Sequence, residues 1–176
     1  YTADNSIGDE CIIKEGSDIT IVTYGIMINE AVSAAKLFEE KGISAEIIKL
    51  SRLDRADYPL VYASAAKTGK IIIAEESARR GSMGTRLLAG LLRNGISVDY
   101  GCGVDLGSGI VEQGSIKELR RKYGIDAEAI VSIGMEWMNN EKRVLQEVES
   151  EWLTIFLSVK PNCFMTRFLI KSPMWR

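Results

Sequence analysis

The chain has 176 residues, of which 46% are hydrophobic and 26% charged, and its formal net charge is −2. This balance is typical of a globular domain, and it excludes intrinsic disorder, collagen-like repeats and a polytopic membrane protein. The near-neutral charge gives no indication of a nucleic-acid partner. The sequence contains no histidine, which excludes Ser-His-Asp and Cys-His nucleophile activation and the commonest zinc sites.

The three cysteines, Cys11, Cys102 and Cys163, lie far apart and form no CxxC pair. This pattern fits a reducing compartment. Residues 1–10 are polar and acidic, without the apolar core of a signal peptide. We therefore predict a cytoplasmic protein. Because the first residue is Tyr1, we also expect the chain to be cut from a longer polypeptide or trimmed at its start.

Short apolar runs alternate with amphipathic segments along most of the chain. Residues 1–17 show turn signals and no sustained periodicity, and we interpret them as an entry segment. The Ser115–Glu118 pattern predicts a capping box, and Asp126 is a candidate N-cap for a further helix. Strands are predicted at 18–24, 45–50, 70–74 and 97–100, and helices at 27–41, 57–68 and 82–94.

This alternation predicts a three-layer α/β domain with a mostly parallel sheet of about five strands and helices on both faces. We place the domain at residues 18–138 and assign residues 139–176 to a C-terminal helix and tail. The tail is aromatic and basic, and its polar residues interrupt any apolar run that could span a membrane. We expect this tail either to dock on the surface of its own domain or of a neighbouring one, or to be a segment foreign to the domain.

Residues 101–109 contain four glycines in a pattern close to a dinucleotide-binding fingerprint. That fingerprint needs its glycines directly between a strand and a helix, so that backbone amides meet the pyrophosphate. The third glycine falls one residue late and no helical pattern begins there. A connecting loop is therefore favoured over a phosphate-binding loop.

The segment after the third predicted strand begins with Glu75 and Glu76, at the sheet edge where α/β domains usually bind ligands or partners. Adjacent carboxylates can act as acid and base or hold a cation. However, neighbouring strand residues point to opposite faces, and Arg79 and Arg80 are close enough to neutralise both carboxylates. We favour a salt-bridged loop over a catalytic pair and predict no catalytic, cofactor-binding or metal-binding residue. We assign an interface role to Glu75, Glu76, Arg79 and Gly81.

Three segments in order resemble the C-terminal domain of the transketolase superfamily. They are EGSDITIVTYG at 15–25, IIIAEESARRGSMGTRLL at 71–88 and IVEQGSIKELRRKYGIDAEAI at 110–130. The resemblance covers about residues 10–135 and is greatest to the 1-deoxy-D-xylulose-5-phosphate synthases, whose terminal run the third segment matches nearly residue for residue. Gln113 stands where those synthases have a histidine.

The resemblance implies part of a thiamine-diphosphate-dependent transferase of isoprenoid precursor synthesis. Thiamine diphosphate and Mg would be bound by pyrophosphate- and pyrimidine-binding domains, on the same or a separate chain. The chain itself would support a homodimer, ligate no cofactor and be inactive alone. Two alternatives stay open: the C-terminal domain of a 2-oxo-acid dehydrogenase E1 β-subunit, and a non-catalytic binding or dimerisation module. Neither the substrate nor the oligomer size follows from the sequence.

Overall fold

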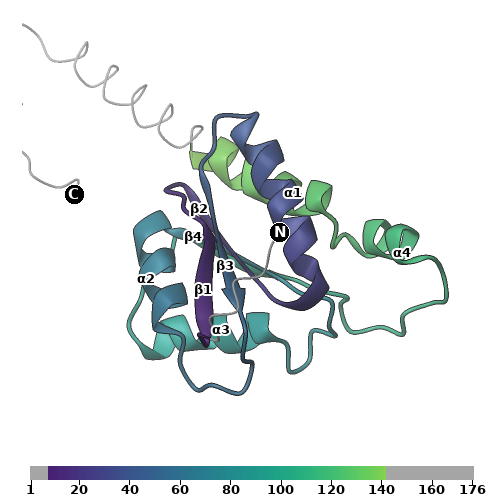
Figure 1. Ribbon diagram of the computed structural model, residues 1–176, viewed down its shortest axis with the longest axis horizontal. Coiled ribbons are helices and arrows are strands. Elements are labelled where there is room, and N and C mark those ends of the chain that lie inside the picture. The colour runs from purple at the N-terminus through teal and green to yellow at the C-terminus, as the bar shows by residue number, and fades with distance from the viewer. Residues whose placement is uncertain (1–7, 142–176) are drawn as a thin grey trace, which may run out of the picture. The chain divides into compact units, whose positions relative to one another are not determined.

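The computed structural model describes residues 8–141 and contains one five-stranded sheet (Figure 1). The strand order is β1-β3-β2-β4-β5, with β1 antiparallel to β3 and all other neighbours parallel. Parallel neighbours need crossover connections, which the intervening helices supply. The strands are β1 (Glu10–Lys14), β2 (Ile19–Thr23), β3 (Ala45–Leu50), β4 (Lys70–Ala74) and β5 (Tyr100–Val104).

Helices cover both faces of this sheet, and Figure 1 shows α1 and α2 on opposite sides of it. The helices are the short η1 (Gly25–Met27), α1 (Ile28–Glu39), α2 (Pro59–Thr68), α3 (Met83–Arg93) and α4 (Ile116–Tyr123), and residues 127–141 are also helical. Residues 8–137 belong to one compact unit, and the helical residues 138–141 to a second.

The core has one half on each face of the sheet. Alternate strand residues, among them Val22, Ile48 and Ile73, pack with α2 and α3 in a cluster of buried side chains. On the other face, a Cβ added to Gly134 would lie 2.5 Å from Cζ of Phe38 in α1 and 3.1 Å from Cδ1 of Ile19 in β2. The helix that begins at residue 127 therefore packs beside α1, where glycine permits the close approach.

The predicted three-layer architecture with a mostly parallel sheet is confirmed, but two strands differ from their predictions. β1 lies inside the predicted entry segment and pairs with β3 at the sheet edge. The fifth strand occupies Tyr100–Val104, whereas the prediction placed it at 97–100. Gly101 and Gly103 therefore lie in a strand, and the predicted loop begins only after Val104.

The two glycines of β5 permit close packing of α3. A Cβ on Gly101 would lie 2.9 Å from Cδ2 of Leu88, and a Cβ on Gly84 would lie 3.2 Å from Cα of Gly103. Tertiary packing thus explains glycines that β-propensity alone disfavours in a strand.

Both predicted helix caps are confirmed. Ser115 and Glu118 form a reciprocal capping box at the start of α4, and Asp126 Oδ1 accepts a hydrogen bond from the backbone N–H of Ala129 at 3.0 Å. The predicted tail beyond residue 141 lies outside the described residues. Within the described range, no helix combines the length and the apolar character that crossing a bilayer requires.

Candidate functional site

The carboxyl ends of β4 and β5 lead into two segments that lie together, and Glu75 is the buried residue between them. Its side chain is 0% exposed. The carboxylate accepts hydrogen bonds from the backbone N–H groups of Met83 at 2.9 Å and Gly84 at 2.7 Å. It also accepts from the hydroxyls of Tyr24 and Ser77, each at 2.9 Å. Glu75 therefore satisfies the first N–H groups of α3 and places a negative charge at its N-terminus.

Tyr24 cannot act as an acid or base near neutral pH in this setting. Burial, followed by the hydrogen bond to Glu75 and the charge of that carboxylate, raises the pKa of Tyr24 to about 12. The phenol remains protonated and donates to Glu75. The hydrogen-bonded Tyr24–Glu75 pair thus has a structural role at the end of β4.

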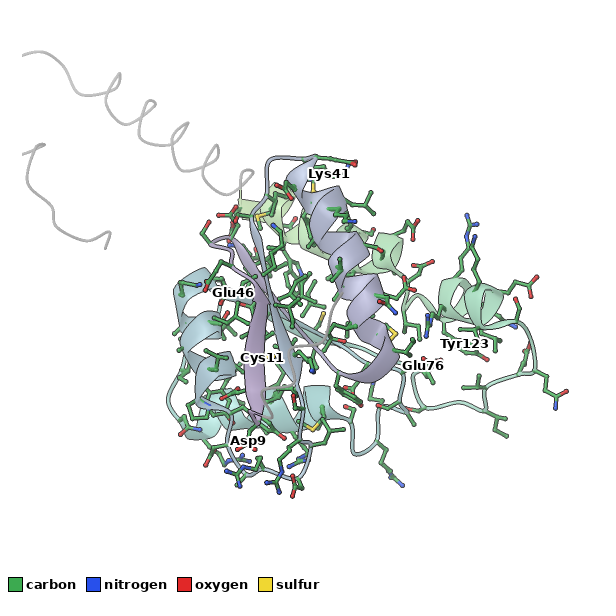
Figure 2. The ribbon with its side chains drawn as sticks, viewed as in Figure 1. Asp9, Cys11, Lys41, Glu46, Glu76 and Tyr123 are labelled. Carbon is green, nitrogen blue, oxygen red and sulfur yellow. The ribbon has the colours of Figure 1, made fainter. Side chains whose placement is uncertain are left out.

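Glu76 points to the opposite face, toward α1 and α4, as the alternation of strand residues predicts. Its carboxylate pairs with Arg120 Nη2 at 2.9 Å, and Arg120 Nη1 pairs with Glu30 Oε1 at 3.2 Å. The other Glu30 oxygen accepts the backbone N–H of Ala127 at 3.1 Å. The side chain of Arg120 is only 12% exposed. This cluster joins α1, the loop after β4, α4 and the helix that begins at residue 127, and Figure 2 shows Glu76 between α1 and α4.

Arg79 pairs with Asp105 and not with either glutamate, so the prediction that it neutralises them is wrong. Its Nε lies 3.2 Å from Oδ1 of the buried Asp105, and that oxygen also accepts the backbone N–H of Gly107 at 2.8 Å. The backbone N–H of Arg79 in turn donates to the carbonyl of Gly107 at 2.8 Å. Gly81 follows with a φ of +80°, a left-handed turn conformation before α3.

Sequence reasoning missed Glu30, Asp105 and Arg120. Each comes from a segment far along the chain from its partners, and no local pattern marks it. The one available signal was the alternation of Glu75 and Glu76, which predicts two separate partners. The pairs that Glu30, Asp105 and Arg120 form follow only from the strand order, which brings the loops after β4 and β5 together.

A cavity of about 580 Å³ lies between α1, α4 and the start of the following helix. Its wall mixes three cationic with three anionic side chains and so favours neither sign of charge. The lining residues are Glu30, Ser33, Ile116, Lys117, Arg120, Arg121, Asp126, Ala127 and Glu128.

The strand-end residues do not fit a diphosphate or a divalent cation. The carboxylate of Glu75 is already the acceptor for four donors, and Glu76 is paired with Arg120. Among residues 8–141, no group of three or more cysteine, aspartate or glutamate side chains is placed to hold a metal ion. The contacts of Glu75 and Glu76 instead fix the loop after β4, α3 and α4 relative to the sheet.

Comparisons with known proteins agree with this architecture. The family model described as the transketolase C-terminal domain matches residues 8–130. 1-Deoxy-D-xylulose-5-phosphate synthase 1 of Geobacter sulfurreducens is 35% identical over 126 residues, which are 72% of this chain and 20% of that protein. The pyruvate dehydrogenase E1 component subunit β of Staphylococcus aureus is 38% identical over 96 residues, or 54% of this chain and 29% of that subunit.

A solved structure titled as a split-gene transketolase, inactive β4 tetramer, is similar with a TM-score of 0.62 and 31% identity. The similarity covers 72% of this chain and 41% of that one. The chain thus spans about a fifth of the synthases, and less than half of each protein compared above. With the family model matched over residues 8–130, the chain belongs to the transketolase C-terminal domain family.

Proposed function

We propose that this chain is the C-terminal, dimer-supporting part of a thiamine-diphosphate-dependent enzyme of the 1-deoxy-D-xylulose-5-phosphate synthase type. The similarity to the Geobacter sulfurreducens synthase, over 72% of the chain, supports this class most strongly. The complete enzyme would transfer an activated two-carbon acyl unit to an aldose phosphate in the cytoplasm, as a step of isoprenoid precursor synthesis. Pyrophosphate- and pyrimidine-binding domains would hold thiamine diphosphate and Mg.

In this proposal the described residues contribute structure and not chemistry. The buried Glu75 supports the proposal because its carboxylate is used within the chain. The loop with Glu75, Glu76, Arg79 and Gly81 would take part in the dimer interface. Because Glu75 is 0% exposed, its part in that interface would be indirect, through the position of the loop and α3.

Calorimetry tests the division of labour between this chain and the cofactor-binding domains. Thiamine diphosphate with Mg²⁺ is titrated into the 176-residue chain, and then into the chain mixed with the cofactor-binding domains of a synthase. We expect no heat of binding for the chain alone. Micromolar binding by the chain alone would overturn the proposal.

The C-terminal domain of a 2-oxo-acid dehydrogenase β-subunit is the second candidate, and the 38% identity to the Staphylococcus aureus subunit favours it. That similarity covers 54% of the chain, against 72% for the synthase. Specific capture of a dehydrogenase-complex acyltransferase would support this class. A non-catalytic module is the third candidate, and a coding region without cofactor-binding domains nearby would favour it.

A further inference from the structure

A small cavity of about 180 Å³ lies between α2, α3 and the loop that precedes α2. It is smaller than the roughly 300 to 1,000 Å³ of pockets that hold drug-sized ligands, so its size suits a small metabolite. The described residues of its wall include two arginines and two tyrosines, and no carboxylate. These lining residues are Ala56, Tyr58, Tyr62, Arg86, Leu87 and Arg93. The cavity therefore favours an anion, unlike the larger cavity beside α4, whose wall carries both signs of charge.

Tyr62 is buried in this wall, and its hydroxyl donates to no acceptor within residues 8–141. The residue is only 6% exposed, and the hydroxyl lies against Gly90 of α3, where an added Cβ would overlap it. Burial, and then the charge of Asp57, raises the pKa of Tyr62, so the phenol keeps its proton. A buried donor is costly unless water or a ligand accepts from it.

The two arginines bring positive charge that no carboxylate of residues 8–141 pairs with. Arg86 and Arg93 are seven residues apart in α3 and lie on the same face of the helix. Arg86 donates to the backbone carbonyls of Leu53 at 2.6 Å and Arg55 at 2.8 Å. These neutral acceptors fix the guanidinium without cancelling its charge. The charge of Arg93 reaches the Tyr62 hydroxyl, because it opposes the rise in that pKa.

The carboxylates of the loop before α2 line a neighbouring cavity. Asp54, Asp57 and Arg55 form that cavity with Ala56, which lines both. Asp54 is paired with Arg52 at 2.7 Å, and Asp57 is exposed to solvent, which screens its charge. The cavity between α2 and α3 therefore keeps its positive character.

We propose that the cavity between α2 and α3 binds a phosphoryl group, with Arg86 and Arg93 donating to its oxygens and the Tyr62 hydroxyl as a further donor. A phosphate monoester offers three terminal oxygens and a charge near −2, whereas a carboxylate offers two oxygens and a single charge. Hydrogen bonds from guanidinium groups to phosphate are among the strongest in proteins. Because Arg86 is already held in place, it loses little conformational freedom on binding. The site is additional to the dimer-supporting role proposed above and does not depend on it.

An NMR titration of the 176-residue chain, labelled with ¹⁵N, tests this site. The probes are glycerol 3-phosphate and inorganic phosphate, and NaCl at equal ionic strength is the control for unspecific effects of anions. We expect saturable shifts of the backbone amides of α2 and α3, with a dissociation constant of about 1 mM or below. Tighter binding of glycerol 3-phosphate identifies a small phosphate ester as the ligand, and equal binding identifies free phosphate. Either result supports the phosphoryl site.

The variants Arg93→Gln and Tyr62→Phe each remove one donor to the phosphoryl group. Because each lost hydrogen bond is made to a charged ligand, we expect either variant to raise the dissociation constant about tenfold. Arg80→Gln is the matched control, since Arg80 is an exposed arginine outside the cavity, and it should leave the dissociation constant unchanged. Without phosphate, Tyr62→Phe should melt at the wild-type temperature, because its hydroxyl donates to no described residue.

Weaker binding in Arg93→Gln and Tyr62→Phe, with wild-type binding in Arg80→Gln, supports the site. Binding that the two cavity variants leave unchanged overturns it. Shifts that do not saturate, or that NaCl reproduces, overturn it as well. A lower melting temperature of Tyr62→Phe without phosphate also contradicts the proposal, because the hydroxyl would then have an acceptor within the fold.

Discussion

Glu75 and Glu76 are adjacent in sequence, yet their environments differ completely. Glu75 is 0% exposed and accepts four hydrogen bonds, whereas the side chain of Glu76 is 38% exposed and forms an ion pair with Arg120. The difference follows from strand alternation, which turns one side chain to α3 and the other to α4. Their contributions to stability should differ accordingly.

We expect Glu75→Ala to lower the free energy of unfolding by about 3 kcal/mol or more, because it leaves two buried backbone N–H groups and the Tyr24 hydroxyl without their acceptor. The matched neighbour Glu76→Ala removes a partly exposed ion pair, which contributes at most about 1 kcal/mol. Urea denaturation of both variants measures the difference. Equal losses would contradict the capping role of Glu75.

Glu46 provides a pH-dependent contribution to stability at the opposite end of the sheet. It is a residue of β3, is 1% exposed and pairs with Lys67 of α2. Burial opposes ionisation of its carboxyl, but hydrogen bonds from Lys67, Ser64 and the Gly16 backbone outweigh burial. The pKa of Glu46 therefore lies below its ordinary value of 4.5. A carboxyl with a lowered folded-state pKa stabilises the fold above its unfolded pKa, and this stabilisation is lost as pH falls through the folded pKa.

We therefore expect the free energy of unfolding of the wild type to fall more steeply below about pH 4.5 than that of Glu46→Gln. Urea midpoints measured through the acid range would show this difference. Glu39→Gln is the control, because the Lys14–Glu39 pair at 3.6 Å is exposed and should contribute little. Parallel pH curves for wild type and Glu46→Gln would show that Glu46 has no such role.

At the scale of elements, the sequence predicted those whose local signals agree with their packing. β2, β3 and β4 are apolar runs buried on both faces, and α1, α2 and α3 follow with their start and stop residues near the predicted positions. The caps at Ser115 and Asp126 depend on neighbours within a few residues, and both were predictable.

β1 and β5 show why the other elements could not be predicted. β1 is a five-residue edge strand without fully buried residues, so its apolar pattern is weak. β5 contains two glycines, whose presence is explained by the approach of α3 from another part of the chain. The candidate site has the same property: Glu30, Asp105 and Arg120 are defined by contacts across 26 to 97 positions of sequence. Such contacts depend on the whole sheet order and leave no local signal.

At the scale of the whole molecule, the Glu30–Arg120–Glu76 cluster connects the loop after β4 to α1 and α4. Among the described residues of α4, Arg120 is the one whose side chain donates hydrogen bonds to both α1 and the loop after β4, so the position of the helix depends on it. Glu76 faces solvent on one side and Arg120 on the other. Removal of the Glu76 carboxylate should therefore loosen α4 while the core of the domain stays intact.

We expect Glu76→Ala to raise the dimer dissociation constant about fivefold, which corresponds to the loss of about 1 kcal/mol from one partly exposed ion pair. Sedimentation measurements at low salt would show the change, and added NaCl should reduce the difference between variant and wild type, because salt screens this pair. Glu40→Ala, at an exposed position just after α1, serves as the control. An unchanged dissociation constant for Glu76→Ala at low salt would remove this residue from the interface proposal. It would mean that α4 keeps its position without the Glu76–Arg120 pair.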